Sequence, residues 1–166
     1  MSSPADGPDI AIVNATILPM SGAQKIERGS ITIRGNAIEA VGAPGAVKAD
    51  GARKIIDANG RVVMPGFVNS HTHIASNMLL RGLLEDVQLF EWLSTMWRLK
   101  RNFDPDTLYW ASLAGLAEMA KAGITTFNEH FDAYAVEPEI EALEKCRSAW
   151  LPTDRPATTR WTCSRR

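Results

Sequence analysis

Apolar and polar residues alternate over short stretches in the first 64 positions, and turn residues separate these stretches. Alternation with a period of two is typical of strands that bury one face. Gly35-Asn36 and Asn59-Gly60 lie between neighbouring stretches, and both residue types tolerate the positive φ of hairpin turns. We therefore predict a small antiparallel sheet without helices. Its strands are expected at 10–18, 31–34, 38–41, 54–57 and 61–64.

The pattern changes at Pro65-Gly66, after which strand-like and helical spacings alternate. Asp104 before Pro105 is typical of a helix start, and Gly123 is typical of a helix end. Strands and helices in alternation indicate an α/β fold with parallel strands. The expected elements are strands at 67–69 and 124–128 and helices at 89–100, 105–122 and 138–145.

The segment 146–166 keeps neither spacing. It contains both cysteines of the chain together with arginines and tryptophans, and disordered termini seldom have this composition. We expect an irregular tail that is not the natural continuation of the chain, such as the product of a shifted reading frame or a misjoined exon. An ordinary disordered terminus is the alternative.

The composition, 45% hydrophobic and 22% charged with a formal net charge of −1, is that of a globular protein. No basic stripe is present, so no nucleic-acid partner is expected. No apolar stretch is long enough to span a membrane, and residues 1–9 lack the apolar region of a secretory signal. Two cysteines cannot form a disulfide framework, so a cytoplasmic location is expected.

His71 and His73 follow a short apolar strand and are candidate metal ligands. Residues two apart in a strand point to the same side, so both imidazoles would enter one space. Two converging neutral imidazoles are half of a site for Zn²⁺ or a similar first-row metal. The alternative is two surface histidines at a strand end.

Four motifs between Val63 and Thr126 resemble the amidohydrolase superfamily. They are most similar to the branch of triazine hydrolases, S-adenosylhomocysteine and methylthioadenosine deaminases, and guanine and cytosine deaminases. The resemblance extends from residue 9 to about residue 145. The motifs are Val63-Met64-Pro65-Gly66-Phe67-Val68-Asn69-Ser70-His71-Thr72-His73, Met78-Leu79-Leu80-Arg81-Gly82, Glu91-Trp92-Leu93 and Ala122-Gly123-Ile124-Thr125-Thr126.

The resemblance implies a metal-dependent hydrolase of non-peptide C–N bonds, most often a deaminase of an N-heterocycle. Zn²⁺ or Fe²⁺ would be held by His71 and His73, the substrate would be a small heterocycle, and the family is often homo-oligomeric. The resemblance also implies an α/β fold with a β-rich N-terminal part. Residues 1–64 would form part of a β-sandwich, and residues 65–145 the first βα units of an incomplete (β/α)₈ TIM barrel.

Four further residues are candidates for substrate binding. Trp92 would line the pocket, or else pack as a core aromatic residue. His130 would contact substrate beyond the second strand, or else be a solvated loop histidine. Asn128 and Asp132 flank it and share this hypothesis. Arg81 and Glu85 are expected to serve local packing and surface ion pairs.

One position departs from the pattern of the adenosine-type deaminases. Those enzymes place a ribose-binding glutamate near the position of Lys100. A charged lysine cannot accept hydrogen bonds from sugar hydroxyls. A nucleoside substrate is therefore disfavoured, and a plain heterocycle is favoured.

Only 93 residues follow His73, whereas a barrel takes about 200 to 250 residues. The remaining ligands and the acid–base residue of the family would lie further along, so no catalytic residue is assigned. We expect these 166 residues to be a truncated, inactive fragment. Two alternatives stay open: a cyclic-amide hydrolase of the dihydroorotase or hydantoinase type, and a non-catalytic β-rich binding module.

Overall fold

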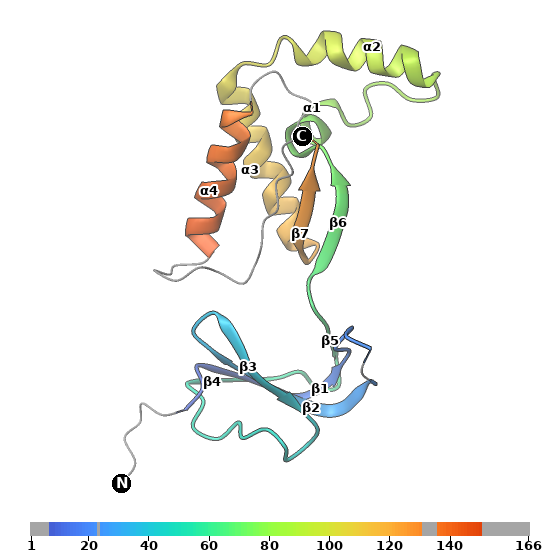
Figure 1. The fold of residues 1–166 in the computed structure, drawn as a ribbon. Helices are drawn as coiled ribbons and strands as arrows, with labels where there is room; N and C mark the ends of the chain where they lie inside the picture. The colour runs from blue at the N-terminus through green and yellow to red at the C-terminus, as the bar shows by residue number, and fades with distance from the viewer. Residues whose placement is uncertain (1–6, 23, 131–135, 151–166) are drawn as a thin grey trace. The chain divides into compact units, whose positions relative to one another are not determined.

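The computed structural model describes residues 7–22, 24–130 and 136–150, with side chains up to Cys146. The chain divides into two compact units, Met1–Pro65 and Gly66–Arg166. Figure 1 shows the strands of the first unit and the mixed strands and helices of the second.

The first unit is a five-stranded sheet in which β3, β2, β1 and β4 lie in that order and β5 also pairs with β1. β2 is antiparallel to both β1 and β3. The predicted hairpin at Gly35 is confirmed, and Gly35 adopts the positive φ of 59° that its turn requires. The strands are β1 (Ile10–Ile17), β2 (Ile26–Arg34), β3 (Ala37–Gly42), β4 (Lys54–Asp57) and β5 (Val62–Val63).

The second predicted hairpin is wrong. β4 and β5 do not pair with each other; both run parallel to β1, one after the other along its free edge. Asn59-Gly60 has the expected positive φ values, 49° and 75°, but it joins the two short strands without reversing the chain. The Gly60 N–H donates to the Asn14 carbonyl at 2.8 Å. Both β4 and β5 therefore pair with the edge of β1 that β2 leaves open. Local turn residues do not determine such a long-range pairing.

Alternation along the strands gives the first unit one buried face. Ala15, Ile17, Ile31 and Ala58 form its buried cluster. Other apolar side chains of the same sheet are more than half exposed, including Ile38 at 66% and Ile55 at 58%. No helix occurs among the described residues of this unit, as predicted.

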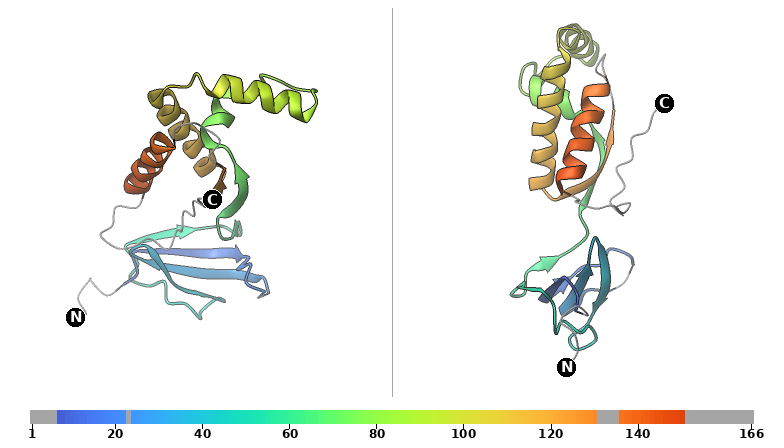
Figure 2. Two further views of the ribbon diagram at one scale, coloured as in Figure 1. Left: turned by 45° about the horizontal axis from the view of Figure 1, so that its top comes forward. Right: turned by 90° about the vertical axis from the view of Figure 1, so that its left-hand side faces the viewer.

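The second unit has two parallel strands, with helices packed against them. Figure 2 shows α3 and α4 side by side in this unit, and α3 contacts β7 directly. The predicted alternation of strands and helices is confirmed, although the helix α1 was not predicted. The elements are β6 (Phe67–Thr72), α1 (Ile74–Leu80), α2 (Leu89–Lys100), α3 (Pro105–Lys121), β7 (Ile124–Glu129) and α4 (Glu137–Trp150).

Helix α4 ends later than predicted, at Trp150 instead of residue 145. The first five residues of the segment expected to be irregular are thus helical. Cys146 packs against the buried cluster of the unit, which gives this last turn a tertiary contact that the sequence spacing does not reveal. Residues 151–166, where the rest of the predicted tail lies, are outside the described part of the chain.

Packing of the helices on the sheet centres on Phe127 of β7. This side chain is 3% exposed and lies in a cluster with Ile74, Leu116, Met119 and Ala142. Residues from β7, α1, α3 and α4 thus share one core. The core fixes α1, and with it the chain segment that immediately precedes α1 at the end of β6.

The start of α3 gives a testable contribution to stability. Asp104 accepts a hydrogen bond from the Thr107 backbone N–H at 2.8 Å, so the predicted N-cap is confirmed. Asp104→Ala is expected to lower the Tm at neutral pH, because that N–H loses its acceptor. The same hydrogen bond lowers the pKa of the Asp104 carboxyl. The advantage of the wild type over Asp104→Ala should therefore be complete above about pH 4 and lost as the pH falls through the lowered, folded-state pKa.

Thermal unfolding followed by circular dichroism at several pH values checks this expectation. Asp104→Asn is the matched control, because asparagine caps a helix almost as well and does not titrate. A difference in Tm between the wild type and Asp104→Ala that stays constant down to about pH 2 would contradict it.

Candidate metal centre and substrate cavity

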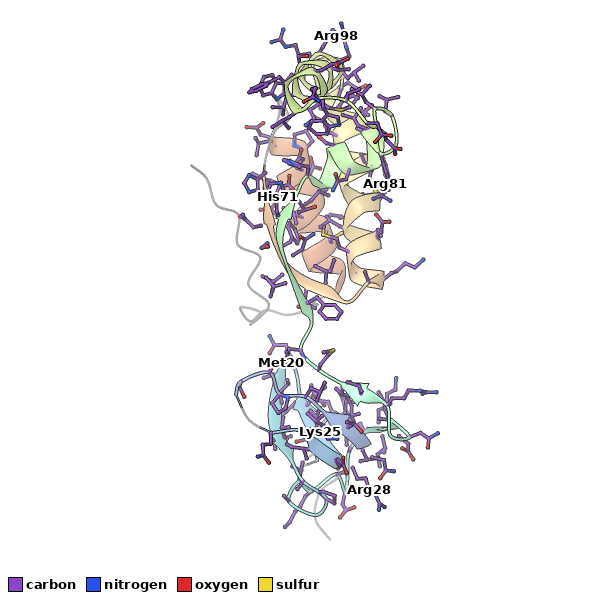
Figure 3. The ribbon with its side chains drawn as sticks, turned by 90° about the vertical axis from the view of Figure 1, so that its right-hand side faces the viewer. Met20, Lys25, Arg28, His71, Arg81 and Arg98 are labelled. Atoms are coloured by element: carbon purple, nitrogen blue, oxygen red, sulfur yellow. The ribbon has the colours of Figure 1, made fainter. Side chains whose placement is uncertain are left out.

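His71 and His73 come together at the end of β6 that leads into α1, where Figure 3 labels His71. Their ring centroids are 5.1 Å apart and the ring planes meet at 84°. With a metal–nitrogen distance of about 2.1 Å, two imidazoles on one tetrahedral ion would have ring centres roughly 5 Å apart. The spacing of the two rings therefore fits a shared first-row metal ion.

The strand β6 directs His71 away from the helices. Its pairing with β7 shifts by one residue between Asn69 and Thr72, so the ladder is irregular there. Thr72 is 5% exposed and packs on the helix side. His71 is exposed and leaves the opposite face.

The orientation of His73 follows from one hydrogen bond. Its Nδ1 lies 2.8 Å from the backbone carbonyl oxygen of His130. A carbonyl oxygen only accepts, so His73 Nδ1 carries the proton and donates. In the neutral ring the lone pair is then on Nε2. A backbone carbonyl that orients a metal-binding histidine in this way is a common arrangement around metal sites.

His130 and Asn128, at the end of β7, join this cluster. The His130 ring lies 4.3 Å from the His71 ring and 5.8 Å from the His73 ring. Its plane is tilted by 31° from that of His71. Asn128 Nδ2 lies 3.4 Å from His130 Nε2 and donates to the Ser70 carbonyl at 3.3 Å. Within the described ranges, no three His, Cys, Asp or Glu side chains converge in a metal-binding arrangement.

Asp132, the remaining predicted neighbour of His130, lies outside the described residues. The structure therefore brings together His71, His73, Asn128 and His130 from two adjacent strands. Trp92 comes from α2 and lines a cavity together with His73.

Glu129 is part of this arrangement, and the sequence did not single it out. It is 3% exposed, and its Oε2 accepts the backbone N–H of Ile74 at 2.9 Å. The His130 N–H also donates to the Thr72 carbonyl at 2.9 Å. Residues on both sides of His73 are thus held by β7. Glu129 shares the helix side of β7 with Phe127, so strict alternation along this strand was the signal that could have marked it as buried.

A cavity of about 250 Å³ opens beside His73. Trp92 and Met96 from α2 line it, together with residues of α1 and of the loop that follows α1. Trp92 is half-buried, so it contributes both to packing and to the cavity wall. Its lining includes the charged residues Arg81, Glu85 and Lys100.

A larger hollow of about 370 Å³ lies between the sheet and helices α1 and α3. It contains neither His71 nor His73, and buried side chains such as Ile74 and Met119 line it. We regard it as a packing gap, because the candidate chemistry lies at the other cavity. Arg81 lines both and forms the predicted surface ion pair, donating to both Glu118 carboxylate oxygens at 3.0 and 2.8 Å.

The chain is similar in sequence to known proteins. Residues 62–156 match the amidohydrolase family, and the chain belongs to that family. A 5-methylthioadenosine/S-adenosylhomocysteine deaminase of Pelotomaculum thermopropionicum is 40% identical over 141 residues, which are 82% of this chain and 32% of that protein. The corresponding enzyme of Symbiobacterium thermophilum is 42% identical over 80% of this chain and 31% of its own length. The predicted family resemblance is thereby confirmed.

Solved structures share the fold of the chain. An adenosine deaminase from Xanthomonas campestris with bound zinc superposes with a TM-score of 0.72 at 24% identity, covering 84% of this chain and 32% of that one. An atrazine chlorohydrolase from Arthrobacter aurescens complexed with zinc gives a TM-score of 0.69 at 26% identity, covering 82% and 33%. The chain thus spans about a third of the length of the relatives it matches. None of the described helices is both long and apolar enough to cross a membrane.

Proposed function

We propose that this chain is the N-terminal part of a metal-dependent deaminase that acts on an N-heterocycle. In this proposal residues 1–64 are part of a β-sandwich, and residues 65–145 are the first βα units of a (β/α)₈ barrel. Deaminase relatives at about 40% identity support the reaction class. Barrel enzymes place their active sites at the carboxyl ends of their strands, which is where the histidines lie on β6 and β7.

The observation that carries the proposal is the joint geometry of His71 and His73. Their rings are 5.1 Å apart, and the bond to the His130 carbonyl leaves the lone pair of the neutral His73 ring on Nε2. These two side chains would hold Zn²⁺, with Fe²⁺ as the alternative ion. A divalent ion held there would supply hydroxide at neutral pH, because it lowers the pKa of water from about 15.7 towards 7.

The other residues of the cluster would act on the substrate. Asn128 and His130 leave the same face of the two strands as His71, so they would present hydrogen-bonding groups to a heterocycle bound over that face. The flat apolar surface of Trp92 would pack against the ring from the cavity side. Asp132 is proposed as a further polar contact from its position in the sequence alone.

We further propose that the 166 residues alone bind metal weakly and do not turn over substrate. Within the part of the chain that the structure describes, the two imidazoles have no third converging ligand. Catalytic zinc sites ordinarily use three protein ligands. No described residue near the histidines is assigned as the acid that would protonate a departing amine.

Zinc uptake by the purified chain tests the proposal. Competition with a chromophoric chelator should show one zinc site that is absent from the double variant His71→Asn/His73→Asn. In the presence of zinc, cytosine should bind to the wild type, whereas ammonia release should stay at background. Zinc uptake equal in the wild type and the double variant would contradict the metal site, and rapid ammonia release would contradict the inactivity.

A further inference from the structure

The proposed metal site has only two protein ligands in one copy of the chain. His71 and His73 supply two imidazoles, and in the part of the chain that the structure describes no group of three His, Cys, Asp or Glu side chains could hold a metal ion. Zinc sites whose ligands are all from protein are almost always tetrahedral, with four ligands. Two imidazoles therefore leave two positions of a tetrahedral ion to be filled from elsewhere.

The histidines belong to a strand that has an exposed side. Asn69 and Thr72 line the hollow on the helix side of β6, whereas His71 and Val68 leave the strand on the other side. His71 is exposed, and Val68 is 70% exposed. Parallel strands are almost always covered on both faces. An apolar side chain on the same strand as the metal-ligand candidates is thus left in water.

The charges of β6 and β7 do not oppose a second copy at this face. β6 contains no charged residue, and the one carboxylate of β7, Glu129, is 3% exposed on the helix side. Imidazoles that bind a metal are neutral. Two such faces can therefore approach without repulsion between like charges. A twofold axis would bring the same patch of each copy together, and with it the two histidine pairs.

The hydrogen bond that orients His73 is compatible with a ligand on the other side of its ring. Its Nδ1 donates to the His130 carbonyl at 2.8 Å, so Nε2 is the nitrogen that would bind zinc. His73 also has a further interaction in the fold. A zinc–nitrogen bond would replace any hydrogen bond that Nε2 accepts, so the site does not require this nitrogen to lack a partner.

We propose that one Zn²⁺ ion joins two copies of this chain, and that His71 and His73 of both copies form a single site of four imidazoles. The inference rests on the proposed function, from which it takes the two ligands. Each copy completes the tetrahedral ion of the other, and Val68 of each copy becomes covered. Zinc binding and self-association are then coupled, because the ion binds the dimer more tightly than either copy alone.

Sedimentation velocity of the purified chain at about 100 µM, with and without zinc, tests the proposal. Half an equivalent of zinc should convert the monomer into a dimer that holds one zinc ion per two chains, and a chelator should reverse the change. Zinc is expected to tighten self-association at least about 100-fold. The double variant His71→Asn/His73→Asn should stay monomeric with zinc, and in a tagged form it should not be captured by the wild type.

Two lysine variants test whether the exposed side of β6 is buried between the copies. Val68→Lys places a charge there and should weaken the zinc-dependent dimer at least about tenfold. Val41→Lys is the matched control, because Val41 is 44% exposed on β3 of the first unit, and it should leave the dimer unchanged. Circular dichroism establishes that each variant is folded. His71→Asn, which changes an exposed side chain, provides the answer if the double variant does not fold.

A chain that takes up zinc through its histidines and remains monomeric would overturn the shared site and leave the proposed function intact. The shared site is also wrong if the dimer forms equally well without zinc or in the double variant, or if Val68→Lys dimerises like the wild type. Zinc uptake that is equal in the wild type and the double variant rejects the proposed function itself.

Discussion

His73→Ala is expected to lower the zinc affinity of the chain at least tenfold. The variant removes one of two imidazoles whose rings stand 5.1 Å apart, and a single histidine at the end of β6 cannot hold the ion in the same way. Even loss of a residue that merely orients a ligand typically costs about 10- to 100-fold in metal affinity. Competition with a chromophoric chelator measures the effect.

His130→Ala is the matched control for this variant. The hydrogen bond between His130 and His73 is made by the backbone carbonyl of His130, which alanine retains, and the Nε2 atom of the His130 ring lies 3.4 Å from Asn128 Nδ2. Zinc affinity should therefore change by no more than about threefold. If His130→Ala weakens zinc as strongly as His73→Ala does, then the third imidazole is itself a ligand and the two-histidine site is wrong.

Glu129→Leu is expected to destabilise the second unit by about 1 to 3 kcal/mol and to weaken zinc binding as well. Leucine removes the carboxylate that accepts the Ile74 N–H at 2.9 Å, and that N–H then stays buried without its acceptor. Because Ile74 directly follows His73, the loss also frees the backbone of a proposed ligand. Urea denaturation measures the stability, and chelator competition measures the zinc affinity.

Two further variants separate a positioning role from a general effect on the fold. Glu129→Gln keeps an oxygen acceptor and should restore most of the zinc affinity that Glu129→Leu loses. Glu141→Leu changes an exposed glutamate on α4 and should alter neither quantity. A stable Glu129→Leu protein with wild-type zinc affinity would show that Glu129 does not position His73.

The predictability of the fold differs between the two units. In the second unit, local chemistry was sufficient to place α3, because Asp104, Pro105 and Gly123 each act through the backbone of their own neighbours. In the first unit, the Gly35 turn was predicted for the same reason. The parallel pairing of β4 and β5 with β1 was not, because a free strand edge can accept any compatible segment of the chain.

The sequence by itself determined the family motifs, the histidine pair at a strand end and most of the helices and strands. These depend on residues a few positions apart, whose geometry the backbone fixes. Only the tertiary structure decided that the His130 carbonyl orients His73, that Glu129 holds Ile74, and that Lys100 lines the same cavity as His73. These relations join residues 57, 55 and 27 positions apart, and packing of the strands and helices alone brings such residues into contact.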